Sequence, residues 1–349
     1  MTRFCLISPV AVLAFVSAPV IAAPAPKEVP VTPISAENAG QVKPILEVPK
    51  TVNRIVRGPN RGALILYDRS AAAEVVDDIT LRPIRKLLKD HRPTDLAISL
   101  DGKLVAFMER NSSGYTVRET DGDKSFEIEI GGNPGYAAFS PDGKLLAIGF
   151  THWAQNAGNA GEGYSDTRLY DLKGKLVRTL EKTGAGAVHP VFSPDGKTLA
   201  VGNRNYETQL FDVATGKLLH KLDRRMTQEV AFRPDGKVLA EGYVDGTVGF
   251  WDVATGKLLH SEASGCKEIY SVDWSPKGDV LATSGREGKI ILWEPGKLTK
   301  LKELDAPFWV IQVRFTADGG RLLTSSAADY GGPADRKVVI WSVPGGAGR

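Results

Sequence analysis

The sequence predicts an all-β protein built from seven similar four-stranded antiparallel sheets, and three observations support this prediction. The phrase Phe211–His220 recurs 40 residues later as Trp251–His260, with only its first residue changed. A second phrase, Phe192–Lys197, recurs at the same spacing as Phe232–Lys237. Variants of both phrases can be followed over residues 41–343, which gives seven units. A period of about 40–45 residues with an aromatic–Asp pair in each unit is typical of the blades of a β-propeller.

The two phrases closely resemble the repeats of the WD-repeat family, and the resemblance covers about residues 41–343. It implies a seven-bladed propeller in which the aromatic–Asp pair ends the third strand of a blade and packs between blades. The Asp–Gly turn would join the first two strands, because Gly adopts the positive φ that tight hairpins require. The family's Gly–His pair is missing before most blades, and only Lys89–His91 is similar to it. We therefore expect the hydrogen-bonded network of strong family members to be incomplete.

The first 23 residues predict a secretory signal peptide. Arg3 gives a positive start, residues 4–20 are mostly apolar, and Val20–Ala22 or Ile21–Ala23 offers a small-residue cleavage site. A membrane anchor is the alternative, but the apolar run is shorter than the roughly 20 residues of a span and contains Pro9 and Pro19. The chain is thus similar to exported bacterial WD-repeat proteins. We expect a periplasmic or secreted protein without a membrane span after cleavage.

The signal is followed by a segment rich in proline, four of which fall within residues 24–33. Such a composition is typical of an extended linker, so residues 24–40 are predicted to lack ordered structure. At the other end, half of residues 344–349 are glycine, which predicts a flexible tail. The propeller itself is expected to occupy residues 41–343.

The blades differ in regularity. The first is the most degenerate, with strands expected at Ala63–Tyr67, Glu74–Asp78 and Ile84–Leu88. The other six each contain a turn that ends in glycine between the first two strands, at Asp101–Gly102, Asp142–Gly143, Asp195–Gly196, Asp235–Gly236, Lys277–Gly278 and Asp318–Gly319.

The last blade lacks a fourth strand, because the chain becomes glycine-rich directly after Trp341–Val343. A ring with an open seam would expose unpaired strand edges, which favour aggregation. The run Val42–Val48, ahead of the first blade, reads as a spare strand. We expect it to complete the seventh blade and close the ring. Pro44 fits an outer edge strand, where a missing N–H is tolerated.

Composition and motifs exclude several functions. The formal charge of +3 is nearly balanced, which gives no support to nucleic-acid binding. Only Cys5 and Cys266 occur, so no disulfide forms within the chain once the leader is removed. His220 and His260 occupy the same repeat position, which explains them better than metal binding. The sequence contains no zinc-like His pair, phosphate loop, nucleophile elbow or dinucleotide fingerprint. No cofactor, metal or catalytic residue is expected.

Two insertions mark one face of the predicted disc. Residues 151–165 and 327–336 both join strands two and three of a blade, so both leave on the side that receives the links between blades. We call this side the loop face. Arg, Trp and Tyr are enriched at binding hot spots, although exposed loops also carry such residues by chance. The candidate partner-binding residues on this face are Arg92, Arg110, Trp153, Arg204, Tyr206, Arg224, Arg225, Tyr243, Arg286, Phe308, Trp309, Tyr330 and Arg336.

Three functions remain open, and family analogy favours the first. A non-catalytic scaffold would dock a protein or peptide partner on the loop face. A propeller enzyme or enzyme-associated subunit, such as a lactonase-like hydrolase or a housing for a redox cofactor, is the alternative. Its candidate acids are Glu162, Asp329 and Asp335, but none has a second partner at a telling spacing. A sensor subunit with a partner of its own is the third.

Overall fold

The computed structural model describes residues 32–343, apart from short gaps. These gaps are 49–51, 53, 58–62, 69–70, 78–79, 89–90, 92, 110–111, 113, 123, 130–132, 154–162, 185–187, 204–206, 223–224, 297–298, 307 and 328–336. The predicted signal peptide, the first part of the predicted linker, the tail and most of both insertions therefore lie outside the described residues. Residues Val31–Arg349 form one compact unit.

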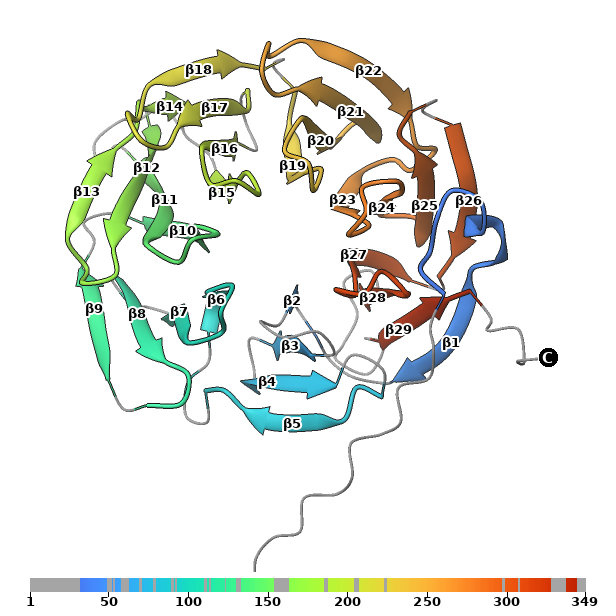
Figure 1. Cartoon of the computed structure of the whole chain (residues 1–349), viewed down its shortest axis with the longest axis horizontal. Coiled ribbons are helices and arrows are strands. Elements are labelled where there is room, and N and C mark those ends of the chain that lie inside the picture. The colour runs from blue at the N-terminus through green and yellow to red at the C-terminus, as the bar shows by residue number, and fades with distance from the viewer. Residues whose placement is uncertain are drawn as a thin grey trace, which may run out of the picture. The chain divides into compact units, whose positions relative to one another are not determined.

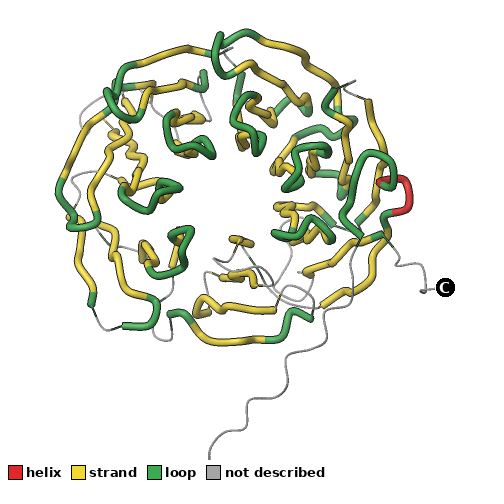
Figure 2. The backbone as a smooth tube through the Cα atoms, in the orientation of Figure 1, coloured by secondary structure: helices red, strands yellow, loops and turns green. Residues whose placement is uncertain are grey.

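Within this unit, seven four-stranded antiparallel sheets are arranged in a ring (Figure 1), which confirms the predicted propeller. Each blade runs from an innermost strand beside the central channel to an outermost strand on the rim. Strand and turn make up nearly all of the described chain (Figure 2), and its one helix is the short 3₁₀ turn Ala39–Gln41. None of the described segments is a helix that could cross a membrane.

The first three blades follow one another in chain order. Blade one contains β2 (Arg54–Arg57), β3 (Ala63–Asp68), β4 (Ala71–Asp77) and β5 (Pro83–Lys86). Blade two contains β6 (Pro93–Ile98), β7 (Leu104–Glu109), β8 (Gly114–Glu119) and β9 (Ser125–Glu129). Blade three contains β10 (Asn133–Phe139), β11 (Leu145–Trp153), β12 (Gly163–Asp171) and β13 (Leu176–Thr179), and the short β14 (Thr183–Gly184) also pairs with β12.

The next three blades include the two most regular repeats. Blade four contains β15 (Val188–Phe192), β16 (Thr198–Asn203), β17 (Gln209–Asp212) and β18 (Leu218–Lys221). Blade five contains β19 (Thr227–Phe232), β20 (Val238–Tyr243), β21 (Thr247–Asp252) and β22 (Leu258–Ala263). Blade six contains β23 (Ile269–Trp274), β24 (Leu281–Gly285), β25 (Lys289–Glu294) and β26 (Thr299–Asp305). As the resemblance implied, the pairs at 211–212 and 251–252 end third strands.

The seventh blade joins the two ends of the propeller. Its inner strands are β27 (Trp309–Phe315), β28 (Arg321–Ala327) and β29 (Lys337–Ser342), and its outer strand is β1 (Lys43–Val48). β1 pairs antiparallel with β29 from Lys43 opposite Ser342 to Val48 opposite Val338. An ion pair between Lys337 and Glu47 reinforces the ladder. The predicted closure of the ring by this strand is therefore confirmed.

The part of the predicted linker that the structure describes differs from the expectation. Ile34 and Ala39 are almost fully buried and belong to the core of blades six and seven. The Ile34 N–H donates to the Gly319 carbonyl at 2.9 Å, and the Asn38 amide donates to the Pro33 carbonyl at 2.8 Å. Proline content predicted an extended chain here, but two apolar side chains were enough to dock residues 32–41 on the propeller.

The turns between first and second strands repeat one set of bonds, seen clearly in blade four. The Ser193 hydroxyl donates to Asp195 Oδ1 at 2.6 Å, and the Lys197 N–H donates to the same oxygen at 3.1 Å. These hydrogen bonds hold the pKa of the Asp195 carboxyl below its ordinary value. Gly196 completes the turn with φ of 71°. The same kind of hydrogen bonding thus fixes the turn between the first and second strands in most blades.

Candidate interaction site

The predicted partner-binding residues divide into two groups. The side chains of Arg225, Tyr243, Arg286, Phe308 and Trp309 are described. The structure does not describe the side chains of the others, which are Arg92, Arg110, Trp153, Arg204, Tyr206, Arg224, Tyr330 and Arg336, nor those of the candidate acids Glu162, Asp329 and Asp335.

Tyr243 does not lie on the surface, contrary to the expectation. Its side chain is only 1 % exposed. The Tyr243 hydroxyl donates to Glu241 Oε2 at 2.5 Å and accepts from the Trp251 indole N–H at 3.0 Å. Burial, with the adjacent Glu241 carboxylate, raises the pKa of the Tyr243 hydroxyl. The residue stabilises blade five and is not available to a partner. The Arg225 guanidinium lies 5.2 Å from its ring centroid.

Three half-buried side chains meet on the loop face between blades six and seven. The Trp309 ring lies 6.1 Å from that of Tyr270, measured between centroids. The Arg286 guanidinium lies 4.6 Å from the Trp309 centroid. We call Tyr270, Arg286 and Trp309 the arginine–aromatic cluster. Arg286 and Trp309 were predicted for this face, but Tyr270 was not, because it lies on β23 with no loop signal of its own.

The cluster joins three elements that are separate in the sequence. Trp309 is the first residue of β27, Tyr270 is the second residue of β23, and Arg286 lies in the turn between β24 and β25. Because strands in a blade alternate in direction, the link between second and third strands and the link between blades leave on the same face. The fold therefore brings the start of one blade beside a turn of the preceding blade.

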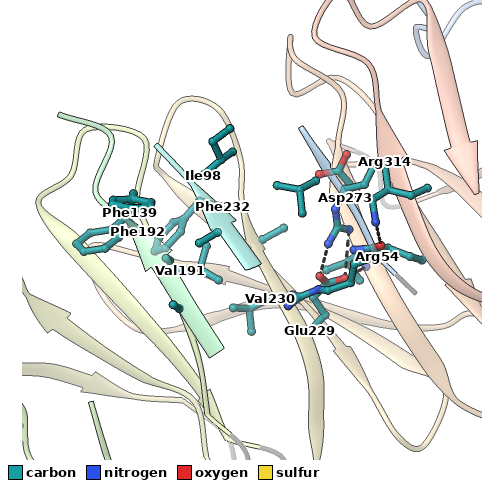
Figure 3. A pocket seen from close by; sticks show the side chains of 18 of the residues that line it. Arg54, Ile98, Phe139, Val191, Phe192, Glu229, Val230, Phe232, Asp273 and Arg314 are labelled. Carbon is teal, nitrogen blue, oxygen red and sulfur yellow. Dashed lines mark hydrogen bonds and ion pairs between the residues drawn. The ribbon is translucent and has the colours of Figure 1, made fainter. Parts of the chain in front are cut away.

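The second feature of interest is the central channel, where inner strands of all seven blades line a cavity of about 400 Å³. Figure 3 shows that its wall has two unlike halves. One half is polar, with Arg54, Glu229, Asp273, Gln312 and Arg314. The other is apolar, with Ile98, Phe139, Val191, Phe192, Val230 and Phe232. A solute in the channel would meet charged groups on one side only.

A set of side chains around the channel occupies a single repeat position, six residues before the residue that precedes the turn glycine of each blade. Glu229 and Gln312 of the polar half belong to it, whereas Asp273 and Arg314 lie two residues further along their strands. We call this set the polar belt. Its members are Asp95, Tyr136, His189, Glu229, Ser271 and Gln312, with Arg54 in the corresponding place of blade one. The sequence does not predict this position, because its residues share neither charge nor shape.

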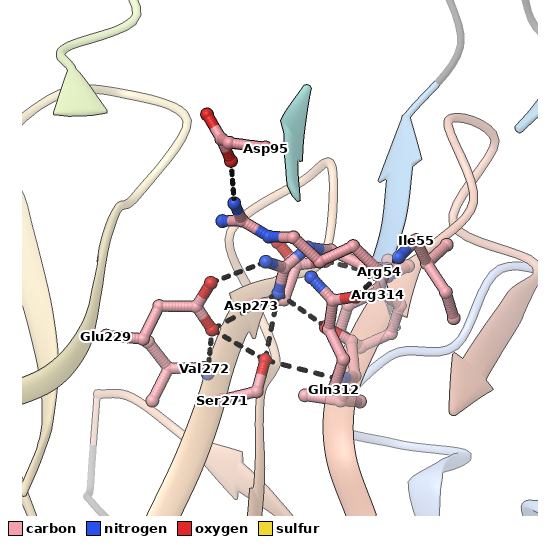
Figure 4. Close-up of polar contacts among 11 residues, drawn as sticks. Arg54, Ile55, Asp95, Glu229, Ser271, Val272, Asp273, Gln312 and Arg314 are labelled. Atoms are coloured by element: carbon pink, nitrogen blue, oxygen red, sulfur yellow. Dashed lines mark hydrogen bonds and ion pairs between the residues drawn. The ribbon is translucent and has the colours of Figure 1, made fainter. Parts of the chain in front are cut away.

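Belt residues bind the backbone of the following blade, and some of these contacts are drawn in Figure 4. The inner edge of each innermost strand has N–H groups that no strand pairs, so side chains supply the acceptors. The Ala137 N–H donates to Asp95 at 3.0 Å, the Val272 N–H to Glu229 at 3.0 Å, the Val313 N–H to Ser271 at 3.2 Å and the Ile55 N–H to Gln312 at 2.5 Å. The last of these bonds crosses the junction between blades seven and one.

An ion pair strengthens the belt beside blade six. Arg314 Nη2 lies 2.5 Å from Glu229 Oε1, although the two residues belong to blades seven and five. Both side chains are largely buried, with 14 % and 17 % exposed. Burial opposes ionisation of Glu229, but the charge and hydrogen bonds of Arg314 outweigh it, so the pKa of the Glu229 carboxyl lies below its ordinary value. The pair is ionised at neutral pH.

A second chain of contacts crosses blades one to four. Arg54 Nη1 donates to Asp95 Oδ1 at 2.7 Å, and its guanidinium lies 4.9 Å from the Tyr136 ring centroid. Tyr136 stacks in turn on His189 at 3.7 Å between centroids. The contacts of the belt thus join the blades in turn, from blade five through six, seven and one to two, three and four.

The histidines and acids of the described chain do not form a metal-binding arrangement. Within the described residues, no group of three or more His, Cys, Asp and Glu side chains could hold an ion. His152 Nε2 lies 3.3 Å from the buried Asp166, which also pairs with Arg168. His220 Nε2 lies 2.9 Å from the Ala254 carbonyl oxygen of the next blade. The histidines therefore have polar neighbours within or between blades.

Comparison with known proteins extends the fold assignment. A family model described as eukaryotic translation initiation factor eIF2A matches residues 159–287, which include both of the most regular repeats. That family has a WD40-like propeller, so the match and the seven observed blades together support a propeller of the WD-repeat type. The likeness concerns the repeat architecture of blades three to six. No curated protein matches the sequence.

Proposed function

We propose that this chain is a non-catalytic scaffold that docks a protein or peptide partner on its loop face. The observation that carries the proposal is the arginine–aromatic cluster, where two half-exposed rings and a guanidinium meet at one junction between blades. Such residues are enriched at binding hot spots because they offer large contact area and directed hydrogen bonds with little conformational freedom to lose. The closed ring of blades holds the cluster rigidly, which lowers the entropy cost of binding.

The test begins with identification of a partner by crosslinking and capture from the native organism. Trp309→Ala should weaken the purified complex by about 1–2 kcal/mol or more, since it removes an aromatic hot spot. The melting temperature should change little, because Trp309 lies at the end of a strand and is half exposed. His260→Ala, on the rim, is the matched control and should bind normally. If wild type, Trp309→Ala and His260→Ala bind the partner with equal affinity, the partner does not dock on this part of the loop face.

Export and the absence of catalysis belong to the same proposal. The leader supports a periplasmic or secreted location, and mass spectrometry of the native protein should then find a mature chain that starts near Ala23 or Pro24. An intact Met1 on soluble protein would contradict export. The lactonase-like or cofactor-housing alternative is tested by a lactonase assay and a metal and cofactor analysis of the same preparation. Turnover in that assay would replace the scaffold proposal.

A further inference from the structure

We infer that Arg286, stacked on Trp309, is a receptor for a carboxylate in an acidic segment of the partner protein. This inference rests on the proposed scaffold function and names the chemistry that the loop face would recognise. Three properties of the cluster support it: a fixed backbone beneath Arg286, a guanidinium that has no anionic partner among the described residues, and aromatic rings beside it.

The turn that carries Arg286 is fixed on both sides. The Arg286 N–H donates to the Glu268 carbonyl at 3.1 Å, and the Ala306 N–H donates to the Gly288 carbonyl at 2.8 Å. Gly288 has φ of 77°, and a Cβ there would lie only 2.3 Å from the Ala306 carbonyl oxygen. The turn is thus locked against the segment that leads into Trp309. Arg286 is presented from a rigid support.

Among the described residues, the Arg286 guanidinium is bonded by no side-chain or backbone acceptor. In the part of the chain that the structure describes, it makes neither an ion pair nor a side-chain hydrogen bond, and its recorded contact is the face of Trp309 at 4.6 Å. Nearby charges are engaged elsewhere: Lys267 lies 3.9 Å from Glu287, and Glu268 accepts from the Gln228 amide. A stacked guanidinium keeps the N–H groups at its edge available, and their planar fork matches a carboxylate.

The surroundings favour a carboxylate with an apolar neighbour in the same segment. The half-buried position excludes part of the solvent, so an ion pair formed there is screened less than one on an open surface. The Trp309 and Tyr270 rings, 6.1 Å apart, offer contact area for an aliphatic side chain beside the acid. An extended segment with alternating acidic and aliphatic residues can place its carboxylate against Arg286 and an aliphatic side chain against the Trp309 and Tyr270 rings.

The experiment uses the full-length chain and two acetylated, amidated pentapeptides, Gly-Leu-Glu-Leu-Gly and its counterpart with Gln in place of Glu. The readout is the ¹⁵N–¹H signal of the Trp309 indole, assigned by its loss in Trp309→Phe, together with the dissociation constant from titration. We expect the Glu peptide to shift this signal and to bind at least about tenfold more tightly than the Gln peptide. Raising the salt concentration should reduce the difference.

Variants separate recognition by Arg286 from a general charge effect. Arg286→Gln should abolish the preference for Glu, and Arg286→Lys should retain only a small part of it, since Lys lacks the planar fork. Arg82→Gln removes the same charge from an exposed site on the opposite face and should leave the preference unchanged. A preference that survives in Arg286→Gln overturns the inference.

Other outcomes distinguish the inference from the proposed function. If both peptides shift the Trp309 signal equally, the face binds peptides without reading a carboxylate, so the inference fails and the scaffold remains. If inorganic phosphate shifts the signal and the Glu peptide does not, the receptor is for another anion and the inference also fails. If the identified partner binds Trp309→Ala and wild type equally, the docking site proposed above fails as well.

Discussion

At the scale of single residues, repeated polar contacts hold the interior of the blades together. The Trp293 indole N–H donates to the Thr283 hydroxyl at 2.9 Å in blade six, and Trp341 donates to Thr324 at 3.0 Å in blade seven. In blade five the Trp251 indole bonds to Tyr243 in place of a threonine. The hydrogen-bonded network of strong WD-repeat family members was expected to be incomplete here, because the Gly–His pairs are missing. The indole hydrogen bonds are the part of such a network that this chain has.

The first prediction concerns the indole bond of blade six. Thr283→Val keeps the shape of the side chain but leaves the fully buried Trp293 N–H without its acceptor. We expect a loss of about 1–3 kcal/mol in the free energy of unfolding, which is the cost of an unsatisfied buried donor. Thr283→Ser keeps the hydroxyl and should lose clearly less. Urea unfolding measures both, and equal losses would show that the methyl group matters more than the bond.

The second prediction concerns the ion pair of the polar belt and its pH dependence. The pKa of Glu229 is lower in the folded chain than in the unfolded one. The pair therefore stabilises the fold fully above the unfolded value, about 4.3, and this stabilisation is lost as the pH falls through the folded pKa. Glu229→Gln should cost about 3 kcal/mol at pH 7, because the largely buried Arg314 loses its ion-pair partner. The difference from wild type should shrink below pH 4.

A double variant controls for this effect. Glu229→Gln combined with Arg314→Met removes both charges, so it should be more stable than Glu229→Gln alone at pH 7. Unfolding by urea at pH 7 and pH 3.5 gives the required free energies. If Glu229→Gln loses the same amount at both pH values, the stabilisation does not come from the ionised pair.

At the scale of whole strands, the outer edge of the disc shows a recurring irregularity. In most outer strands one residue is skipped in the pairing register, which marks a β-bulge. Five of the skipped residues are exposed apolar side chains, namely Ile45, Ile84, Val177, Leu219 and Leu259, whereas Leu301 of β26 is half-buried against the core. A bulge turns its extra residue away from the ladder and twists the edge, which discourages pairing with other chains. The bulges in the outer strands therefore account for these exposed apolar side chains at the rim.

Outer strands also bind the turn of the next blade. Arg178 of β13 donates to the Ala214 and Thr215 carbonyls, both at 2.7 Å, and His220 of β18 lies 2.9 Å from the Ala254 carbonyl. His260 occupies the same repeat position as His220 but pairs with Glu262 of its own strand at 3.2 Å. Equivalent residues in the sequence therefore have different roles at successive junctions.

The third prediction compares these rim positions. Arg178→Ala removes two hydrogen bonds from a charged, half-buried donor to the next blade, so it should cost about 1–2 kcal/mol. His220→Ala removes one bond and should cost about 0.5–1 kcal/mol. His260→Ala removes no contact between blades and should be nearly neutral. Chemical unfolding of the three variants checks the order, and a loss in His260→Ala as large as in Arg178→Ala would contradict it.

At the scale of the whole molecule, the sequence predicted those features that depend on local chemistry repeated at a fixed period. The Asp–Gly turns and the 40-residue spacing located the blades, and the spare strand at 42–48 located the closure. The polar belt and the position of Tyr270 were not predicted, because their contacts join residues of different blades. The error over residues 32–40 has another cause: proline content was given more weight than Ile34 and Ala39, whose burial depends on a core that forms elsewhere in the chain.

Closure of the ring leads to the fourth prediction, which uses three truncated chains. A chain that starts at Val31 keeps every described bond, so its melting temperature should stay within about 2 °C of wild type. A chain that starts at Val42 loses the buried side chains of Ile34 and Ala39. Burial of an isoleucine contributes about 1.5–3 kcal/mol, and each kcal/mol corresponds to about 2–4 °C in a protein of this size. We expect a melting temperature several degrees lower, with a ring that remains closed.

A chain that starts at Val52 also loses β1, and here the physical effect is of another kind. The outer edge of β29 then has no partner, and the hydrogen bonds from Lys43 opposite Ser342 to Val48 opposite Val338 are absent. An unpaired edge at an open seam offers a template for other chains. This truncation should therefore melt at a much lower temperature and form aggregates, as measured by calorimetry and light scattering. Similar melting of the chains that start at Val42 and Val52 would mean that β1 is dispensable and that blade seven is stable with three strands.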